Sequence, residues 1–187
     1  GLRAGATRAA NRSALALATS PGTDIYHDGM EGLAQLLAPD GWRLLPIDMQ
    51  PRLVHPEGIL SFAVSSAINV GRANLRAPRT RRKGTSTRNS LGPGPSIPTL
   101  FETDAEQLAE LQRTAEKAPF YFLLFERITV VRPGLLLEFS RPAAMTDGGS
   151  VVAWGDRIPV PFLDLEGDLS VFDEPGDQEF DVAVEPR

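Results

Sequence analysis

The chain has no cysteine among its 187 residues. This absence excludes disulfide bonds, thiolate catalysis, iron–sulfur clusters and zinc sites built on cysteine. The chain also lacks any apolar run near the roughly 18 residues that a membrane-spanning helix needs, since its densest run covers only residues 120–125. We therefore expect a cytoplasmic protein that has no membrane partner.

Acidic residues are absent from residues 59–101. Residues 1–101 contain twelve basic and six acidic side chains, whereas residues 102–187 contain seven basic and eighteen acidic ones. The net charge of −5 therefore combines a basic first half with an acidic second half. Only two of the nineteen basic residues are lysines, a preference that the codon bias of a GC-rich bacterial genome explains. The clustering of the arginines carries more information than their number.

Length and composition predict one soluble domain over residues 1–187, because 42% apolar and 23% charged residues are typical of globular proteins. Alanine and leucine predict a first helix over residues 3–19, ended by the sequence Ser-Pro-Gly that follows it. A second helix is predicted over residues 29–37, with Asp28 as its cap. Strands are predicted over residues 42–47 and 59–70, and we expect these two to be neighbours.

The second half of the chain changes from helical to strand-like patterning. Thr103 and Glu106 have the spacing of a capping box, which predicts a helix that ends near Lys117. Four strand-like runs then follow, separated by turn residues: 120–131, 135–140, 151–154 and 158–163. We therefore expect an α+β fold, with a mainly antiparallel sheet, a C-terminal β-meander and two to three helices.

Two segments lack the apolar pattern of a packed element. Residues 71–100 are rich in proline, glycine and hydroxyl side chains, and we expect a long basic loop or arm there. Residues 164–187 contain nine carboxylates against one basic residue, which predicts an acidic, partly disordered tail.

The basic loop is the strongest candidate for a binding site. Arginine forks match two phosphate oxygens at once, and the hydroxyls and glycine between them add further donors. No aromatic ring occurs in residues 71–100 on which an unpaired base could stack, so duplex backbone is the better ligand. The alternative is a solvated loop that folds onto the acidic tail or onto an acidic protein partner. The candidate nucleic-acid-binding residues are Arg72, Arg76, Arg79, Arg81, Arg82, Lys83 and Arg88.

Motifs for catalysis, metals and cofactors are weak or missing. His27 and His55 each lie near acidic residues, and such a pair could serve a divergent hydrolase as general base. Asp164, Glu166 and Asp168 alternate like the start of a calcium loop, but a leucine follows where that loop needs glycine. Nuclease, Walker, dinucleotide and Gly-x-Ser-x-Gly patterns are absent. We expect no cofactor and no metal, and favour a protein that is not an enzyme.

The most distinctive strings of the second half are LEFSRP at residues 137–142 and WGDRIPVP at residues 154–161. Trp154 is expected to anchor a corner of the sheet, with Arg157 paired to Asp156 or Glu138. Together the two strings resemble uncharacterised actinobacterial proteins found beside DNA-modification and restriction genes. That resemblance implies a DNA-associated role and names no catalytic residue.

These observations predict a non-enzymatic, DNA-associated or assembly subunit that contacts the phosphate backbone through its arginine-rich loop, as part of a larger complex. Two alternatives remain open. One is a protein–protein interaction module that binds no nucleic acid, and the other is the hydrolase that uses His27 or His55.

Overall fold

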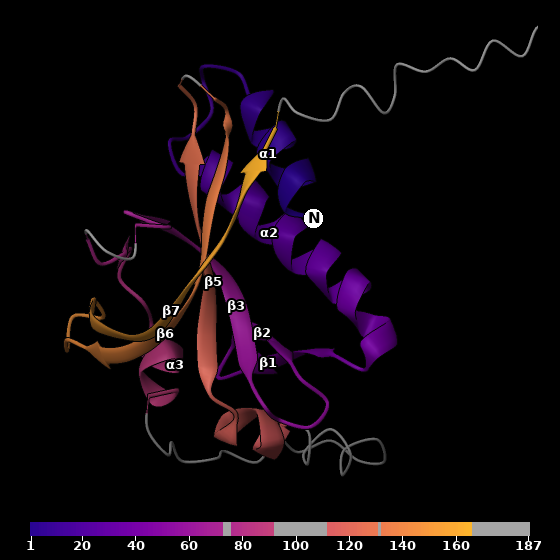
Figure 1. Ribbon diagram of the computed structural model, residues 1–187, viewed down its shortest axis with the longest axis vertical. Coiled ribbons are helices and arrows are strands. Elements are labelled where there is room, and N and C mark those ends of the chain that lie inside the picture. Colours follow the sequence, from indigo (N-terminus) through magenta and orange to yellow (C-terminus); the bar gives the residue numbers. More distant parts are fainter. Residues whose placement is uncertain (73–75, 92–111, 131, 166–187) are drawn as a thin grey trace, which may run out of the picture.

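The computed structural model describes residues 1–72, 76–91, 112–130 and 132–165, and these residues form an α+β fold (Figure 1). Within them a seven-stranded mixed sheet has the order β1-β2-β3-β5-β6-β7, and the short strand β4 pairs with β3. Every pairing is antiparallel except that between β3 and β5. The strands are β1 Arg43–Ile47, β2 Gln50–Val54, β3 Ser61–Ile68, β4 Arg79–Thr80, β5 Phe120–Ile128, β6 Gly134–Met145 and β7 Val151–Asp164.

The predicted fold class and the C-terminal meander of β5, β6 and β7 are confirmed. The last two predicted strands are in fact one strand, because no turn forms at Gly155. Instead, the pairing of β6 with β7 shifts register near Pro142 and Trp154. Irregularities of this kind bend a long strand without ending it.

The helices of the structure are α1 Leu2–Ala10, α2 Ser20–Leu37, the 3-10 turn η1 Ala38–Asp40 and α3 Thr85–Asn89, and residues 112–117 are also helical. The predicted boundaries of the first two helices are wrong. Pro21 lies in the first turn of α2, where a missing N–H costs nothing, so the Ser-Pro-Gly sequence begins a helix rather than ending one. Asp28 is not a cap but a buried side chain inside α2.

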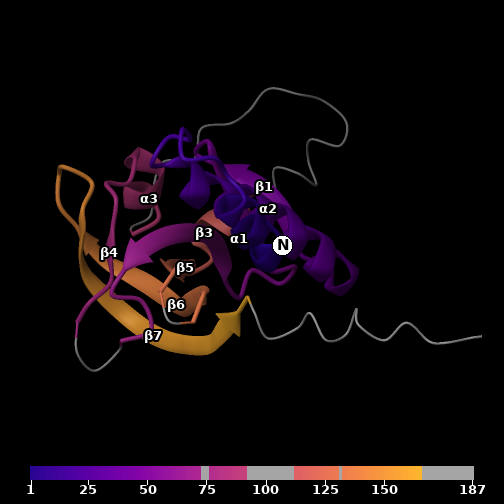
Figure 2. The same ribbon diagram turned by 90° about the horizontal axis from the view of Figure 1, so that it is seen from above.

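Helices α1 and α2 lie side by side on one face of the sheet (Figures 1 and 2). Their close approach needs residues without large side chains, since a Cβ at Gly5 would come within 2.7 Å of the Ile25 Cα. Ala6 and Ala9 are buried in the same contact. The main core consists of these residues together with aliphatic and aromatic side chains from β2, β3, β5 and β6.

The strand β2 was not predicted, and it lies between the two strands expected to be neighbours. Asp48 and Met49 both have positive φ, which is typical of the two-residue turn of a tight hairpin and joins β1 to β2. Pairing of β2 with β3 is limited to Leu53 with Phe62 and Val54 with Ser61. Beyond these pairs the two strands diverge, and the candidate site lies where they do.

Residues 76–91, which we call the basic strap, are packed against the sheet rather than free. Pro78 and Thr87 are buried, and the strap contains both β4 and α3. This part of the predicted loop or arm is therefore ordered. Residues 92–100, Thr103 with its capping box, and residues 166–187 of the acidic tail lie outside the described residues. Among the described residues, no helix is both long and apolar enough to cross a membrane.

Candidate functional site

Arg52 fastens the basic strap to the sheet. This side chain is only 2% exposed, and its guanidinium lies over the Phe120 ring at 4.3 Å. It donates hydrogen bonds to the Ser86 carbonyl oxygen at 3.1 Å and to the Ser90 Oγ at 2.5 Å. Burial lowers the pKa of Arg52 to about 10. Sequence reasoning missed Arg52, because a single arginine between Pro51 and Leu53 carries no sequence signal of burial.

Further hydrogen bonds hold the strap at both of its ends. The Trp154 indole donates to the Pro78 carbonyl oxygen at 2.9 Å, so Trp154 does act as an anchor. The Lys83 amide donates to the Gly149 carbonyl oxygen at 2.7 Å, and Arg88 donates to the carbonyl oxygens of Thr146 and Asp147. The strap is therefore fixed to the turn between β6 and β7 as well as to β2.

The predicted site residues fall into three environments. Arg88 is exposed, but its guanidinium is bound to the two carbonyls of the β6–β7 turn. Lys83 is half-buried, with its side chain between the strap and the sheet. The other five are exposed and have no ion pair with a carboxylate in the described part of the chain: Arg72, Arg76, Arg79, Arg81 and Arg82.

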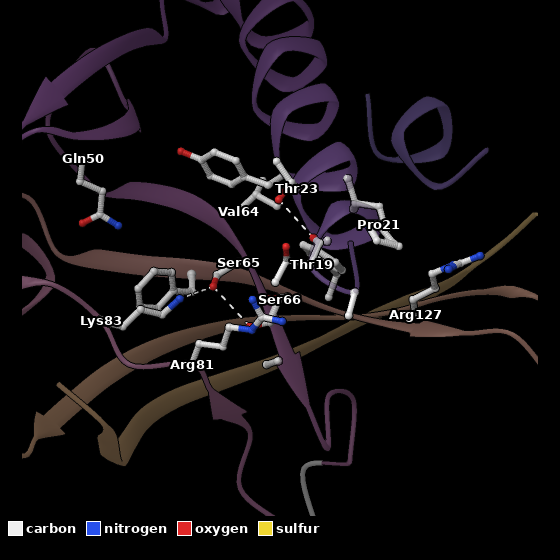
Figure 3. A pocket seen from close by; sticks show the side chains of 17 residues that line it. Thr19, Pro21, Thr23, Gln50, Val64, Ser65, Ser66, Arg81, Lys83 and Arg127 are labelled. Carbon is white, nitrogen blue, oxygen red and sulfur yellow. Dashed lines mark hydrogen bonds between the residues drawn. The ribbon is translucent and has the colours of Figure 1, made fainter. Parts of the chain in front are cut away.

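A cavity of about 390 Å³ lies where β2 and β3 diverge, between the strap and the first turn of α2. Three cations from two segments line it, namely Arg81 and Lys83 from the strap and Arg127 from β5 (Figure 3). Its lining residues include no carboxylate. Five hydroxyl groups line the cavity as well, from Thr19, Thr23, Tyr26, Ser65 and Ser66.

Lys83 is the most perturbed cation of the cavity. Its Nζ donates a hydrogen bond to the Ser65 Oγ and lies 4.8 Å from the centre of the Phe122 ring. Burial, and then repulsion from Arg81, lower the pKa of Lys83 to about 8. An ammonium group has three donors, so Lys83 can still donate to a ligand inside the cavity.

Helix α2 and strand β5 complete the cavity. The first turn of α2 lines it, and the N-terminal end of a helix carries a partial positive charge. Arg127 comes from β5, on the same side of that strand as Phe125, which also lines the cavity. Sequence reasoning missed Arg127 and Ser65, because each is an isolated polar residue in a strand far along the chain from the strap. The assembled site can bind an anion.

The two histidines do not form the base-and-carboxylate pair considered from sequence. His27 packs edge-on against Tyr26, and the carboxylates near it are taken by arginines: Asp24 by Arg12 and Asp28 by Arg8. The hydrogen bonds from Arg12 lower the pKa of Asp24. Among the residues described, His27 and His55 line neither this cavity nor a second one beside Phe120.

His55 accepts a hydrogen bond at its Nδ1 from the backbone amide of Glu57. No group of three or more side chains that could hold a metal ion occurs in the described residues. Asp164, the first residue of the calcium-like pattern, forms an ion pair with Arg132 at 2.5 Å, while Glu166 and Asp168 lie outside the described residues.

Glu138 and Arg157 form a buried ion pair with an Nε–Oε1 distance of 2.6 Å, one of the two pairings predicted for Arg157. Burial acts to raise the pKa of Glu138, but hydrogen bonds from Arg157, Ser140 and the Gly71 amide lower it further than burial raises it. Glu126 accepts from the Val70 amide in the same way. These acids therefore hold the end of β3 where the chain turns toward the strap.

Comparisons of the chain with protein-family models, with curated proteins and with solved structures find no match in any of the three.

Proposed function

We propose that this protein binds the phosphate backbone of duplex DNA through Arg72 and the exposed arginines of the basic strap, as a non-enzymatic, DNA-associated or assembly subunit. One observation carries the proposal. Arg72, Arg76, Arg79, Arg81 and Arg82 are exposed and have no carboxylate partner among the described residues. Uncompensated guanidinium groups bind phosphate oxygens by charge-assisted hydrogen bonds.

The anchoring of the strap supports this function. Binding by a flexible arm would cost the entropy of ordering it, whereas Arg52 and Trp154 already hold the strap in place through backbone and side-chain hydrogen bonds. The resemblance of residues 137–142 and 154–161 to actinobacterial proteins found beside DNA-modification genes favours DNA as the polyanion.

The test is the salt dependence of binding to a fluorescent duplex, measured by anisotropy. Arg76, Arg79 and Arg82 are replaced together by alanine, and the matched control replaces Arg3, Arg43 and Arg141, which are exposed elsewhere. Each phosphate contact contributes about 0.9 to the slope of log K against log salt. We expect the strap variant to lose about 2 to 3 from that slope and the control to lose much less.

Equal slopes for the two triple variants would overturn the proposal. If the wild-type protein binds no duplex at low salt but does bind an acidic protein partner through the same three arginines, the interaction-module alternative replaces it. For the hydrolase alternative, the ion pairs of Asp24 and Asp28 with Arg12 and Arg8 do not favour His27 as a general base.

A further inference from the structure

The cavity beneath the strap carries positive charge that the described protein does not balance. Arg81, Lys83 and Arg127 line it, and its lining residues contribute no carboxylate. Like charges that lie close together repel one another, and the pKa of Lys83 is lowered by its burial and then by the nearby Arg81. An anion in the cavity would relieve this repulsion.

The composition of the lining favours a phosphate group over other anions. Four hydroxyls line the cavity beside the cations, from Thr19, Thr23, Ser65 and Ser66. Those of Thr23 and Ser65 donate to the carbonyl oxygens of Thr19 and Ser66, so the hydroxyls of Thr19 and Ser66 can donate to oxygens of a ligand. A carboxylate has two oxygens and one charge, whereas a phosphate monoester carries close to two charges on three free oxygens at neutral pH. The cavity therefore matches the monoester in both charge and number of donors.

The shape of the site separates monoesters from backbone diesters. A backbone phosphodiester is bonded to a nucleotide on each side and cannot enter a closed end of a pocket, so it suits the exposed arginines of the strap. A volume of about 390 Å³ lies within the usual range for small-molecule pockets of about 300 to 1,000 Å³. It has room for a terminal phosphate and the sugar attached to it.

We propose that this cavity binds a phosphate monoester, with Lys83, Arg81 and Arg127 as its cationic ligands and the hydroxyls of Thr19 and Ser66 as further donors. Two sources share this chemistry, a terminal phosphate of a nucleic-acid strand and a free phosphorylated small molecule. The strand-end source rests on the proposed duplex binding; the site itself does not.

The first experiment measures the binding of inorganic phosphate by calorimetry. Lys83→Met and Arg127→Gln remove cations from the cavity, and Arg43→Ala is the matched control because Arg43 is an exposed arginine outside the strap that does not line the cavity. We expect phosphate affinity to fall at least tenfold in each cavity variant and by less than twofold in Arg43→Ala. Circular dichroism spectra and melting curves show that each variant is folded. Binding that is absent in the wild type, or equal in all variants, would overturn the proposal.

The pH dependence of phosphate binding gives an independent readout. Arg81 is the charged group that acts on Lys83, while Arg127 from β5 and Tyr26 from α2 line the same cavity, and no acidic side chain lines it. Since phosphate stays a dianion above about pH 7, a loss of affinity at higher pH reports on Lys83. We expect affinity to fall about tenfold between pH 8 and pH 9.5 in the wild type and to stay flat in Lys83→Met. A flat wild-type profile counts against Lys83 as a ligand.

A third measurement distinguishes the two sources and the two proposals. Duplexes of one sequence, with 5′-phosphate or 5′-hydroxyl ends, are compared on the wild type and on Lys83→Met. If the 5′-phosphate raises the duplex affinity of the wild type fivefold or more, and Lys83→Met loses this gain, the strand end is supported as the ligand. Phosphate binding without any duplex binding supports the cavity with a small-molecule ligand and overturns the duplex function. Duplex binding without phosphate binding supports the duplex function and overturns the cavity as a phosphate site.

Discussion

Three consecutive basic residues of the strap have different surroundings. Arg81 and Lys83 line the cavity, while Arg82 between them is exposed and does not. Side chains two apart in an extended segment point to the same side, and the one between them points away. Alternation therefore places Lys83 and the more exposed Arg81 on the cavity side of the strap and Arg82 on the other side.

The unusual environment of Lys83 predicts a pH-dependent contribution to stability. A lysine whose pKa is about 8 when folded and 10.5 when unfolded binds fewer protons in the folded state. Stability therefore rises with pH between those two values. We expect the unfolding free energy of the wild type, relative to Lys83→Met, to increase by about 2 to 3 kcal/mol from pH 7.5 to pH 10.5.

Urea titrations at several pH values check this prediction. Lys117→Met is the matched control. Because Lys117 is exposed, the difference in unfolding free energy between the wild type and this variant should change little over the same pH range. A difference between wild type and Lys83→Met that does not vary with pH would show that Lys83 is well solvated.

At the scale of elements, the short helix α3 depends on tertiary contacts. Five residues are too few for a helix to be stable alone in water. Arg52 binds the carbonyl of Ser86 inside α3 and the hydroxyl of Ser90 just after it. Asn89 also donates to the Asp48 carboxylate at 3.0 Å. The β1–β2 hairpin therefore holds α3 in place.

Replacement of Arg52 by methionine should loosen α3 while keeping the core packed. The variant removes the hydrogen bonds from Arg52 to the Ser90 hydroxyl and to the Ser86 carbonyl, although that carbonyl keeps its bonds from the hydroxyl and the amide of Ser90. We expect a loss of about 2 kcal/mol in stability. Hydrogen exchange should quicken in peptides covering the basic strap and change little in β5. Arg43→Ala, which changes an exposed arginine of the same hairpin, is the control. Unchanged exchange in the strap would mean that Arg52 does not anchor it.

At the scale of the whole molecule, the candidate site is assembled from segments far apart in the sequence. Ser65 comes from β3, Lys83 from the strap and Arg127 from β5, and the strap itself is held by the β6–β7 turn. Gly149 in that turn has a φ of +82°, and a Cβ there would overlap the Lys83 carbonyl oxygen. Only glycine suits both the backbone conformation and the close approach.

We therefore expect Gly149→Ala to weaken phosphate binding although Gly149 does not line the cavity. The substitution should displace the strap around Lys83, with a loss of about 1 to 2 kcal/mol in stability. Gly148→Ala is the matched control, since a Cβ there meets no atom closer than 3.8 Å. Calorimetry with inorganic phosphate and a melting curve measure both effects. Equal phosphate affinity in the two variants would exclude this coupling.

Local patterns predicted much of the secondary structure but not its boundaries. The meander was predictable because Phe120–Ile128 and Gly134–Met145 contain strand-like runs rich in apolar residues and separated by turn residues. The join between α1 and α2 was misplaced because Pro21 can begin a helix as well as end one. The strand β2 was missed because Pro51 weakens its pattern, and only its pairing with β1 and β3 makes it a strand.

By itself, the sequence determined the charge asymmetry, the lack of thiol chemistry and the concentration of arginines in residues 72–88. The tertiary structure decided which of those cations lie only at the surface and which line a cavity together with Ser65 and Arg127. The physical reason is that charge is a property of each residue, whereas burial, hydrogen bonding and a shifted pKa depend on which distant segments the sheet brings together. Lys83 shows the difference, because its place in the strap is local but its surroundings come from β3 and β5.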